Sequence, residues 1–355
     1  MLLFGSGSLL SIPYKKRFQQ NVLPQSIKSV SHICCITHGI SISYIKSHTL
    51  TVSEKDTREV RWMQNGICIV NYFSSDHVNR LIHEFARDKL QLPVVVVDNS
   101  VDRAESIKLE NITKFSWTSE INLSILSNNS NLGYYFGNYT GVAYLKEKFG
   151  VKKVLIVNPD VSSENWCLLI EELGKYFVNP EDFIAGPKIN NGTRFVSSPI
   201  PDMPPFLIAA YNFFYPLTYL IYKCFQRKLS SSPGNETFAV EGSCMLVDTE
   251  KFLSIYEHMN GVFLYEEERI IGTIAKQNAW RIYYVPAVEI SHLHKPLSLS
   301  TQNERYYISS TNKYLDILNA RKLTRKIVIA SLRYRFFVKK MISSIIRLFR
   351  RGVKK

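Results

Sequence analysis

Acidic and amide side chains follow apolar runs at two places in this chain of 355 residues. Residues 94–97 are four valines that end in Asp98, and residues 154–157 are followed by Asn158 and, after a proline, by Asp160. Short β-branched runs of this kind are typical of buried parallel strands, whose carboxyl ends meet along one edge of a sheet. Asn158 and Asp160 therefore indicate a site for a hard divalent cation, with a diphosphate supplying further ligands. A plain turn after the strand is the structural alternative for both residues.

Asp98 and a glycine-rich segment indicate a second ligand at the same edge. A carboxylate at a strand end can accept hydrogen bonds from a nucleotide base or ribose, although an acid in an Asp-Asn-Ser turn also caps that turn. Residues 131–138 carry Gly and Asn ahead of a helical pattern from 140 to 148, so the backbone could approach a ligand near a helix start. Their spacing is neither that of a Walker loop nor GxGxxG, and a turn-rich connection is the alternative. The predicted nucleotide-binding residues are Asn71, Asp98, Asn131, Gly133, Gly137 and Asn138.

Three consecutive glutamates, residues 266–268, follow an aromatic and apolar segment and open a helical pattern from 270 to 276. A carboxylate at this place could remove a proton from a hydroxyl as its oxygen attacks a carbon atom. Acids in a first helical turn are also favoured by the helix dipole, and three adjacent acids cannot all point inward. We predict Glu267 and Glu268 as the catalytic pair, with the choice between them open.

Two strand patterns, at 282–286 and 288–294, end in histidines. Either His292 or His294 could reach a metal or a phosphate, although a lone histidine at a strand end is more often structural. His292 is favoured because the strand pattern ends there. The predicted metal ligands are therefore Asp160, Asn158 and His292.

The elements that must position these residues alternate between strand and helix. A strand at 67–72 precedes a segment of helical spacing at 76–90, and the strand at 94–98 follows. This order predicts an α/β fold, a single Rossmann-like domain with a central, mostly parallel sheet flanked by helices. An apolar, aromatic-rich stretch from 206 to 222, interrupted by Pro216, predicts an interfacial or buried helix pair. The six cysteines lack zinc-like spacing, which favours reduced thiols and a cytoplasmic protein.

The formal net charge of +14 comes from the tail, because residues 321–355 hold 13 Lys and Arg and no Asp or Glu. The rest of the chain is almost neutral, which argues against a nucleic-acid-binding protein. The tail pattern predicts a basic amphipathic helix on an anionic membrane surface, with a helix docked on its own domain as the alternative. The apolar arc holds Tyr334, Phe337, Val338, Met341, Ile345 and Leu348, and the opposite arc holds Arg333, Lys339, Lys340, Arg347, Arg350 and Arg351.

In order and spacing, these motifs resemble glycosyltransferase family 2, in particular its rhamnosyltransferase-like members, over about residues 67–300. The family's metal-binding Asp-x-Asp equivalent matches 158–160, and its base motif matches 263–268. Its glycine-containing acceptor segment resembles 240–246, which implies acceptor-side roles for Glu241 and Gly242, and its late His-to-Ser element resembles 292–298. Tyr139 stands where the family usually has Asn, and Glu268 replaces the usual Asp.

The resemblance implies a GT-A fold, a nucleotide-diphosphate sugar donor (dTDP- or UDP-linked), a Mg2+ or Mn2+ ion and inversion at the anomeric carbon. It further implies a polyprenyl-diphosphate-linked glycan acceptor in bacterial surface-polysaccharide synthesis. The basic tail would then hold the protein on the inner face of the cell membrane.

The expected domain organisation has three parts. Residues 1–62 form a poorly defined leader, disordered or not native, with Met63 as a candidate start. The GT-A domain spans 63–305, with a donor half at 63–189, an acceptor half at 238–305 and an apolar helical insertion at 204–228, and a basic helical tail spans 306–355. The alternatives are a non-catalytic scaffold or a nucleotidyltransferase of related topology, although residues 71–79 lack the glycine-rich phosphate loop of the latter.

Overall fold

The computed structural model of the protein describes residues 64–115, 121–192, 198–230, 236–292 and 299–352. The expected leader at 1–62, Met63, His294 and Ser298 lie outside these residues. Side chains are described as far as residue 345 of the tail, so those of Arg347, Leu348, Arg350 and Arg351 lie outside the described part of the chain.

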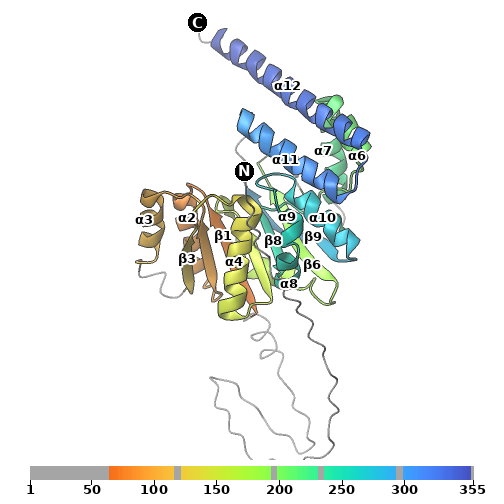
Figure 1. Cartoon of the computed structure of the whole chain (residues 1–355). Coiled ribbons are helices and arrows are strands. Elements are labelled where there is room, and N and C mark those ends of the chain that lie inside the picture. The colour runs from red at the N-terminus through yellow and green to blue at the C-terminus, as the bar shows by residue number, and fades with distance from the viewer. Residues whose placement is uncertain (1–63, 116–120, 193–197, 231–235, 293–298, 353–355) are drawn as a thin grey trace, which may run out of the picture. The chain divides into compact units, whose positions relative to one another are not determined.

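The described residues build one sheet in the strand order β3-β2-β1-β4-β8-β6-β9-β5, with β7 paired to β9 (Figure 1). β1 to β4 run parallel to one another, β8 lies antiparallel between β4 and β6, and β9 runs parallel to β6. The predicted mostly parallel sheet is therefore confirmed. The strands are β1 (Asn65–Asn71), β2 (Val94–Asp98), β3 (Leu123–Ser127), β4 (Lys153–Val157), β5 (Val161–Ser162), β6 (Asp182–Asn190), β7 (Glu236–Thr237), β8 (Cys244–Asp248) and β9 (Arg281–His292).

Helices cover both faces of the sheet, as predicted, because successive side chains of a strand point to opposite faces. Ile67 and Ile69 of β1 pack in the cluster that contains α2, α3 and α5. Cys68, between them, packs in the cluster that contains α4, α8, α9, α10 and α11. The helices are α2 (Ser75–Arg87), α3 (Arg103–Ile112), α4 (Gly133–Phe149), α5 (Trp166–Gly174), α6 (Pro205–Phe213), α7 (Leu217–Ser230), α8 (Thr249–Ser254), α9 (Tyr256–Met259), α10 (Glu267–Gln277), α11 (Thr301–Ile317) and α12 (Lys322–Gly352).

Two sequence-based boundaries were wrong. The loop predicted at 131–138 ends early, because α4 already begins at Gly133 and lies over β1 and β2 (Figure 1). The two strands predicted at 282–286 and 288–294 are one strand, β9. A bulge opposite Pro187 and Lys188 of β6 interrupts its pairing without ending it, which explains why the sequence pattern looked divided.

Gly133 is required where α4 begins. Its φ of +77° lies in the left-handed region, and an added Cβ would stand 2.1 Å from the carbonyl oxygen of Phe263. Gly150, at the other end of α4, has a φ of +65° but open space around its Cβ position. A residue with a Cβ would therefore strain the backbone at either position, but it would overlap another atom only at Gly133.

We expect Gly133→Ala to destabilise the fold more than Gly150→Ala. The left-handed conformation alone costs about 1–2 kcal/mol for a residue with a Cβ, and the overlap at Gly133 adds to that cost. Urea denaturation of the two variants measures the difference. Equal losses of unfolding free energy would contradict this expectation and show that the loop around Phe263 moves aside at no cost.

The C-terminal helices belong to the same compact unit as the sheet. The expected boundary between 305 and 306 falls inside α11, whose Tyr314 and Leu315 are buried in the core. The apolar stretch at 206–222 forms a helix pair, α6 and α7, as predicted. Among the helices of the described residues, none has the length and apolar character needed to cross a bilayer.

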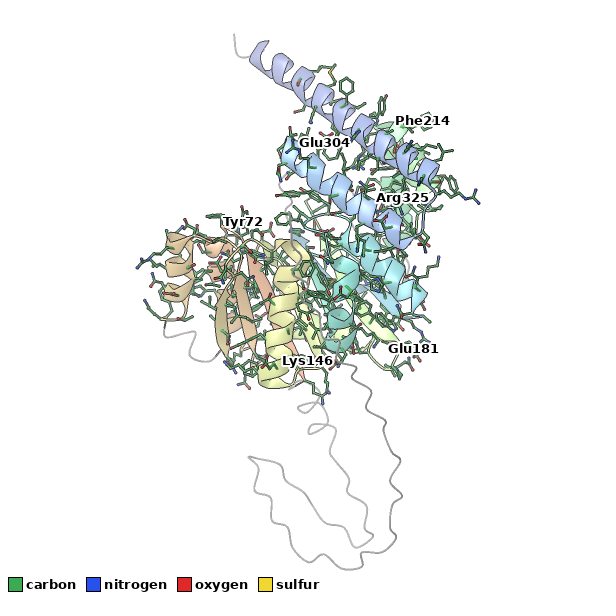
Figure 2. The ribbon with its side chains drawn as sticks, in the orientation of Figure 1. Tyr72, Lys146, Glu181, Phe214, Glu304 and Arg325 are labelled. Atoms are coloured by element: carbon green, nitrogen blue, oxygen red, sulfur yellow. The ribbon has the colours of Figure 1, made fainter. Side chains whose placement is uncertain are left out.

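The predicted basic arc of α12 is partly wrong, because two of its lysines face the protein. Lys340 Nζ lies 2.6 Å from Glu304 Oε2 of α11, and Lys339 Nζ lies over the ring of Tyr215. Figure 2 shows Glu304 beside α12. Only Arg333, of the predicted basic residues with described side chains, is fully exposed.

Candidate active site

Asn71 and Asp98 lie side by side at the carboxyl edge of the sheet, because β1 and β2 are paired with these residues in register. Asp98 Oδ1 accepts hydrogen bonds from Asn71 Nδ2 at 3.1 Å and from Ser100 N at 3.0 Å. Its Oδ2 accepts from Ser106 Oγ at 2.9 Å. Asn71 Nδ2 also lies 3.3 Å from Glu105 Oε1. Both side chains are thus engaged in hydrogen bonds that join neighbouring segments at this edge. Their role in nucleotide binding stays a prediction.

Part of the glycine-rich segment at 131–138 lies in a loop at the edge of the sheet, and part lies in α4. Asn131 stays in the loop, where its Oδ1 accepts from Gly133 N at 2.9 Å. Gly137 and Asn138, in contrast, lie inside α4 and are buried against the sheet. A Cβ on Gly137 would stand 2.8 Å from Asn99 Nδ2, so this glycine permits close helix packing. The structure therefore does not bring Gly137 and Asn138 to the edge as predicted.

Asp160 and His292 meet at the same edge, as their placement after β4 and at the end of β9 predicted. Val161 of β5 pairs with His292, and His292 Nε2 lies 3.2 Å from Asp160 Oδ1. On the other side of the ring, His292 Nδ1 lies 3.1 Å from Glu241 Oε1. The His292 side chain is 4% exposed and that of Asp160 is 38% exposed, so the histidine is inside and Asp160 faces outward.

Strand pairing explains why Glu241 joins this cluster. β8 runs antiparallel to β4, so the residues before β8 lie beside those after β4. Asn158 N donates to Ser243 O at 2.8 Å, which continues that pairing, and Ser243 Oγ donates to Glu241 Oε1 at 3.1 Å. The acceptor-side segment and the metal-site turn are therefore neighbours.

The two carboxylates stabilise the protonated form of His292. Burial lowers the pKa of the imidazole, but the hydrogen bonds to Asp160 and Glu241 outweigh it and raise that pKa to about 9. The pKa of Asp160 is lowered, because the hydrogen bond and charge of His292 outweigh the effect of burial. The ring therefore donates from both nitrogens at neutral pH.

This arrangement predicts a pH-dependent stability. The folded-state pKa of His292 lies above its ordinary value of 6.5, so its contribution is complete below about pH 6.5 and is lost as the pH rises through about 9. The shift corresponds to on the order of 3 kcal/mol, shared with the two carboxylates. Denaturation curves across this window should fall more steeply for the wild type than for His292→Gln. Parallel pH profiles would contradict the assignment.

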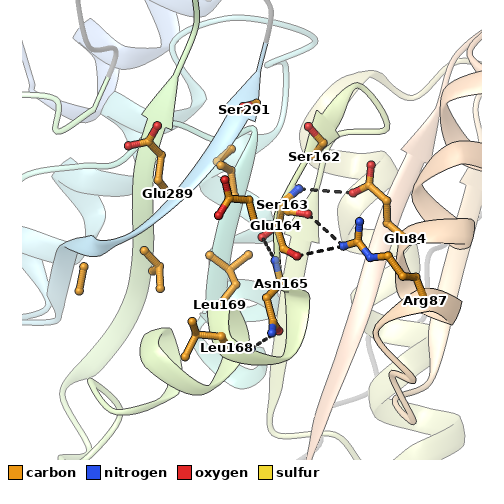
Figure 3. A pocket seen from close by; sticks show the side chains of 13 residues that line it. Glu84, Arg87, Ser162, Ser163, Glu164, Asn165, Leu168, Leu169, Glu289 and Ser291 are labelled. Carbon is orange, nitrogen blue, oxygen red and sulfur yellow. Dashed lines mark hydrogen bonds between the residues drawn. The ribbon is translucent and has the colours of Figure 1, made fainter.

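Helix α2 holds the turn that carries Asp160. Arg80 Nη2 donates to Pro159 O at 3.1 Å and to Val161 O at 3.0 Å, the carbonyls on either side of Asp160. One and two turns further, Glu84 and Arg87 bind the segment after β5 (Figure 3). They line a pocket of about 670 Å³ next to the site. Arg80 is thus a positioning residue that the sequence analysis missed.

Glu268 reaches the same cluster from the first turn of α10. Its Oε1 accepts from Gly242 N at 3.2 Å, and the hydroxyl of Tyr134 donates to the carbonyl of Gly242. Glu267 is 4% exposed, and its Oε1 has no hydrogen-bond partner among the described residues. Gly242 thus joins Glu268 to the Glu241 side of the site.

The loop before α10 is strained. Tyr265 and Glu266 are both left-handed, with φ of +73° and +66°, and Arg269 Nε holds Glu266 Oε2 at 3.3 Å. Such conformations cost on the order of 1–3 kcal/mol each and persist where the surroundings impose them. This strained turn sets the direction in which the chain enters α10, and thereby the positions of Glu267 and Glu268.

Burial raises the pKa of both Glu267 and Glu268, and the proximity of the glutamates adds to the shift. A carboxylate with a raised pKa is a stronger base, and general bases work best when their pKa lies near the working pH. Glu268 combines this shift with access to the cluster, whereas Glu267 is enclosed. Glu268 is the better placed of the two to remove a proton.

The described residues contain no group of three or more His, Cys, Asp and Glu side chains that could hold a metal by themselves. Asp160 Oδ1 and His292 Nε2 are paired with each other at 3.2 Å, and Asp160, which is 38% exposed, is the member of the pair that a cation could reach. Mg2+ is usually bound through one or two carboxylates together with substrate phosphates, so this incomplete donor set fits a cation that arrives with a diphosphate.

Solved structures similar to the chain include the mannosyltransferase PcManGT from Pyrobaculum calidifontis in complex with GDP-Man and Mn2+. The identity is 12% and the TM-score 0.49, over 84% of this chain and 86% of that chain. Mannosyl-3-phosphoglycerate synthase from Rubrobacter xylanophilus has 15% identity and a TM-score of 0.45, over 76% of this chain and 77% of that chain.

Glucosyl-3-phosphoglycerate synthase from Mycobacterium tuberculosis, in complex with Mn2+, UDP and glucosyl-3-phosphoglycerate, has 11% identity and a TM-score of 0.45. This likeness covers 73% of this chain and 81% of that chain. No model of a known protein family matches the sequence, and no curated protein does. At these identities and TM-scores the similarities are not evidence for a function of this chain.

Proposed function

We propose that this protein is an inverting, metal-dependent glycosyltransferase of GT-A type that uses a nucleotide-diphosphate sugar. The observation that carries the proposal is the unbroken series of contacts from Asp160 through His292 and Glu241 to Gly242 and Glu268. It connects an outward-facing acid suited to a cation with a buried acid suited to a base. A metal-dependent, inverting transfer uses both.

Asp160 and His292 would hold the cation, with Asn158 beside them. A histidine that ligates a metal is neutral, so His292 would release a proton when the cation binds. Mg2+ or Mn2+, when bound, neutralises charge on the departing diphosphate. The residues also match the order of motifs that resembles glycosyltransferase family 2, which supports the same division of roles. In this proposal Asn71, Asp98 and Asn131 contact the nucleotide along the same edge.

Glu268 acts on the acceptor. The acceptor hydroxyl transfers its proton to the Glu268 carboxylate as its oxygen bonds to the anomeric carbon. The bond from that carbon to the diphosphate oxygen breaks, and the electron pair leaves on the diphosphate. A single displacement of this kind inverts the configuration at the sugar carbon.

The acceptor in this proposal is a polyprenyl-diphosphate-linked glycan of bacterial surface-polysaccharide synthesis, and the transferred sugar is of the rhamnose type. Support comes from the resemblance and from the exposed apolar and basic residues of α12, which suit a protein on the inner face of the cell membrane. In this proposal, Glu241 and Gly242 lie with Glu268 on the side of the site where the acceptor binds.

Calorimetric titration with UDP, dTDP and GDP, in Mg2+, in Mn2+ and in chelator, tests the donor site. We expect one nucleotide to bind in the presence of a cation and binding to weaken in chelator. Equal affinities with and without a cation would contradict the metal site, and the absence of binding by every nucleoside diphosphate would overturn the function.

A further inference from the structure

Helix α12 presents an apolar stripe that faces away from the protein. Its docked side is buried and includes Val328, Leu332 and Phe336. The members of the exposed stripe are separated by steps of three, four and seven residues, so they share one side of the helix. The stripe consists of Leu323, Ile327, Tyr334, Phe337, Met341 and Ile345.

Helices α6 and α7 extend this stripe into a broader apolar face. The rings of Phe213 and Tyr334 lie with their centres 5.9 Å apart, which joins the end of α6 to the stripe. Phe214, 65% exposed, lies at the same end of α6, beside α12 (Figure 2). Leu217, Leu220 and Ile221 of α7 are also exposed. An exposed apolar surface of this kind marks a contact with a partner or a membrane.

Two cations lie on the side of α12 that contacts α6. Arg335 and Lys339 are one helical turn apart on α12. The Arg335 guanidinium carbon is 5.1 Å from the ring centre of Tyr211, and its Nη1 donates to Asn212 Oδ1 at 3.2 Å. Lys339 Nζ is 5.5 Å from the ring centre of Tyr215. Their contacts are thus with neutral groups.

Two other basic residues on the side of α12 that contacts the protein are paired with acids, in contrast to Arg335 and Lys339. Lys340 pairs with Glu304 and Arg325 pairs with Asp316. Among the ion pairs of the described residues, none includes Arg335 or Lys339. Burial, together with the charge of Arg335, lowers the pKa of Lys339 to about 8. Two like charges held together at a partly desolvated place favour a bound anion.

We infer that Arg335 and Lys339 bind the phosphate of an anionic phospholipid when the face formed by α6, α7 and α12 lies on a bilayer. Arginine can grip a phosphate through two parallel N–H groups, and the adjacent aromatic and aliphatic side chains suit acyl chains. The inference extends the membrane location given in the proposed function. Lipid binding requires no step of sugar transfer, so the lipid site can be wrong while the proposed function is right, and the reverse.

Binding of the full chain to vesicles tests the inference by co-sedimentation. One set of vesicles is phosphatidylcholine alone, and the other contains phosphatidylglycerol. The test variant is Arg335→Gln with Lys339→Gln, and the matched control is Lys326→Gln with Arg333→Gln, exposed residues of the same helix whose replacement removes the same charge. Far-ultraviolet circular dichroism and the thermal unfolding midpoint serve as the check that each variant is folded.

We expect the test variant to bind phosphatidylglycerol vesicles at least about tenfold more weakly than the control variant, because it loses charge-assisted hydrogen bonds and not only charge. Arg335→Lys, which keeps the charge but not the paired N–H groups, should also bind more weakly than the wild type.

Equal losses in the test and control variants would show that only total charge matters and would overturn the inference. So would wild-type binding that is the same for both kinds of vesicle. Binding to a single-stranded RNA homopolymer without binding to vesicles would assign the surface to nucleic acid and would also overturn it.

Discussion

Glu268→Gln should lower the rate of sugar transfer by about 10²–10⁴, the usual contribution of a general base. The amide keeps the size of the side chain and loses the ability to accept a proton. Nucleotide binding should be unchanged, because Glu268 contacts Gly242 on the acceptor side and not the turn that carries Asp160. The measurement is the initial rate of transfer from the donor identified by calorimetry to lipids extracted from native membranes.

Glu267→Gln is the matched control, since it makes the same change one residue earlier. Glu267 is enclosed and lacks a hydrogen-bond partner on Oε1 among the described residues, so we expect a smaller fall in rate. A larger fall for Glu267→Gln would transfer the role of base to that residue. Unchanged turnover in both variants would remove the glutamate pair from the mechanism.

Asp160→Ala should abolish the effect of Mg2+ or Mn2+ on nucleotide binding and reduce transfer by at least about 10³, a loss of several kcal/mol of charge stabilisation. The fold should survive, because Asp160 is half-exposed and Arg80 binds the backbone on both sides of it, not its carboxylate. Calorimetry of the variant with each cation and with chelator checks the first expectation.

The control for this variant is Glu164→Ala, an exposed acid shortly after Asp160 whose replacement removes the same charge. It should retain the wild-type response to cations. If Asp160→Ala also retained that response, Asp160 would not be a metal ligand. If both variants lost it equally, the cation would be responding to the general charge of this edge.

The strands that carry the site were predictable because their signal is local. Four valines before Asp98 and a β-branched run before Asn158 form buried parallel strands in any suitable fold, and an acid that follows such a strand must lie at its carboxyl edge. The proximity of Asp98 to Asn71 followed from that rule, whereas Asp160 meets His292 through the antiparallel pairing of β5 with β9.

The start of α4 was not predictable in the same way. Gly133 and Gly137 were interpreted as loop residues, because glycine favours turns. Only the packed structure shows that Gly137 lies within the helix where Asn99 and Val70 leave no room for a Cβ. A glycine needed for close packing and a glycine needed for a turn have the same appearance in a sequence.

Short-range hydrophobic patterns were enough to predict the parallel sheet, the acids at its edge and the helical nature of the tail. The tertiary structure decided which of these residues meet. Antiparallel pairing of β8 with β4 brought Glu241 to His292, and docking of α12 turned Lys339 and Lys340 toward the protein. Both depend on contacts between segments far apart in the chain, which periodicity within one segment does not specify.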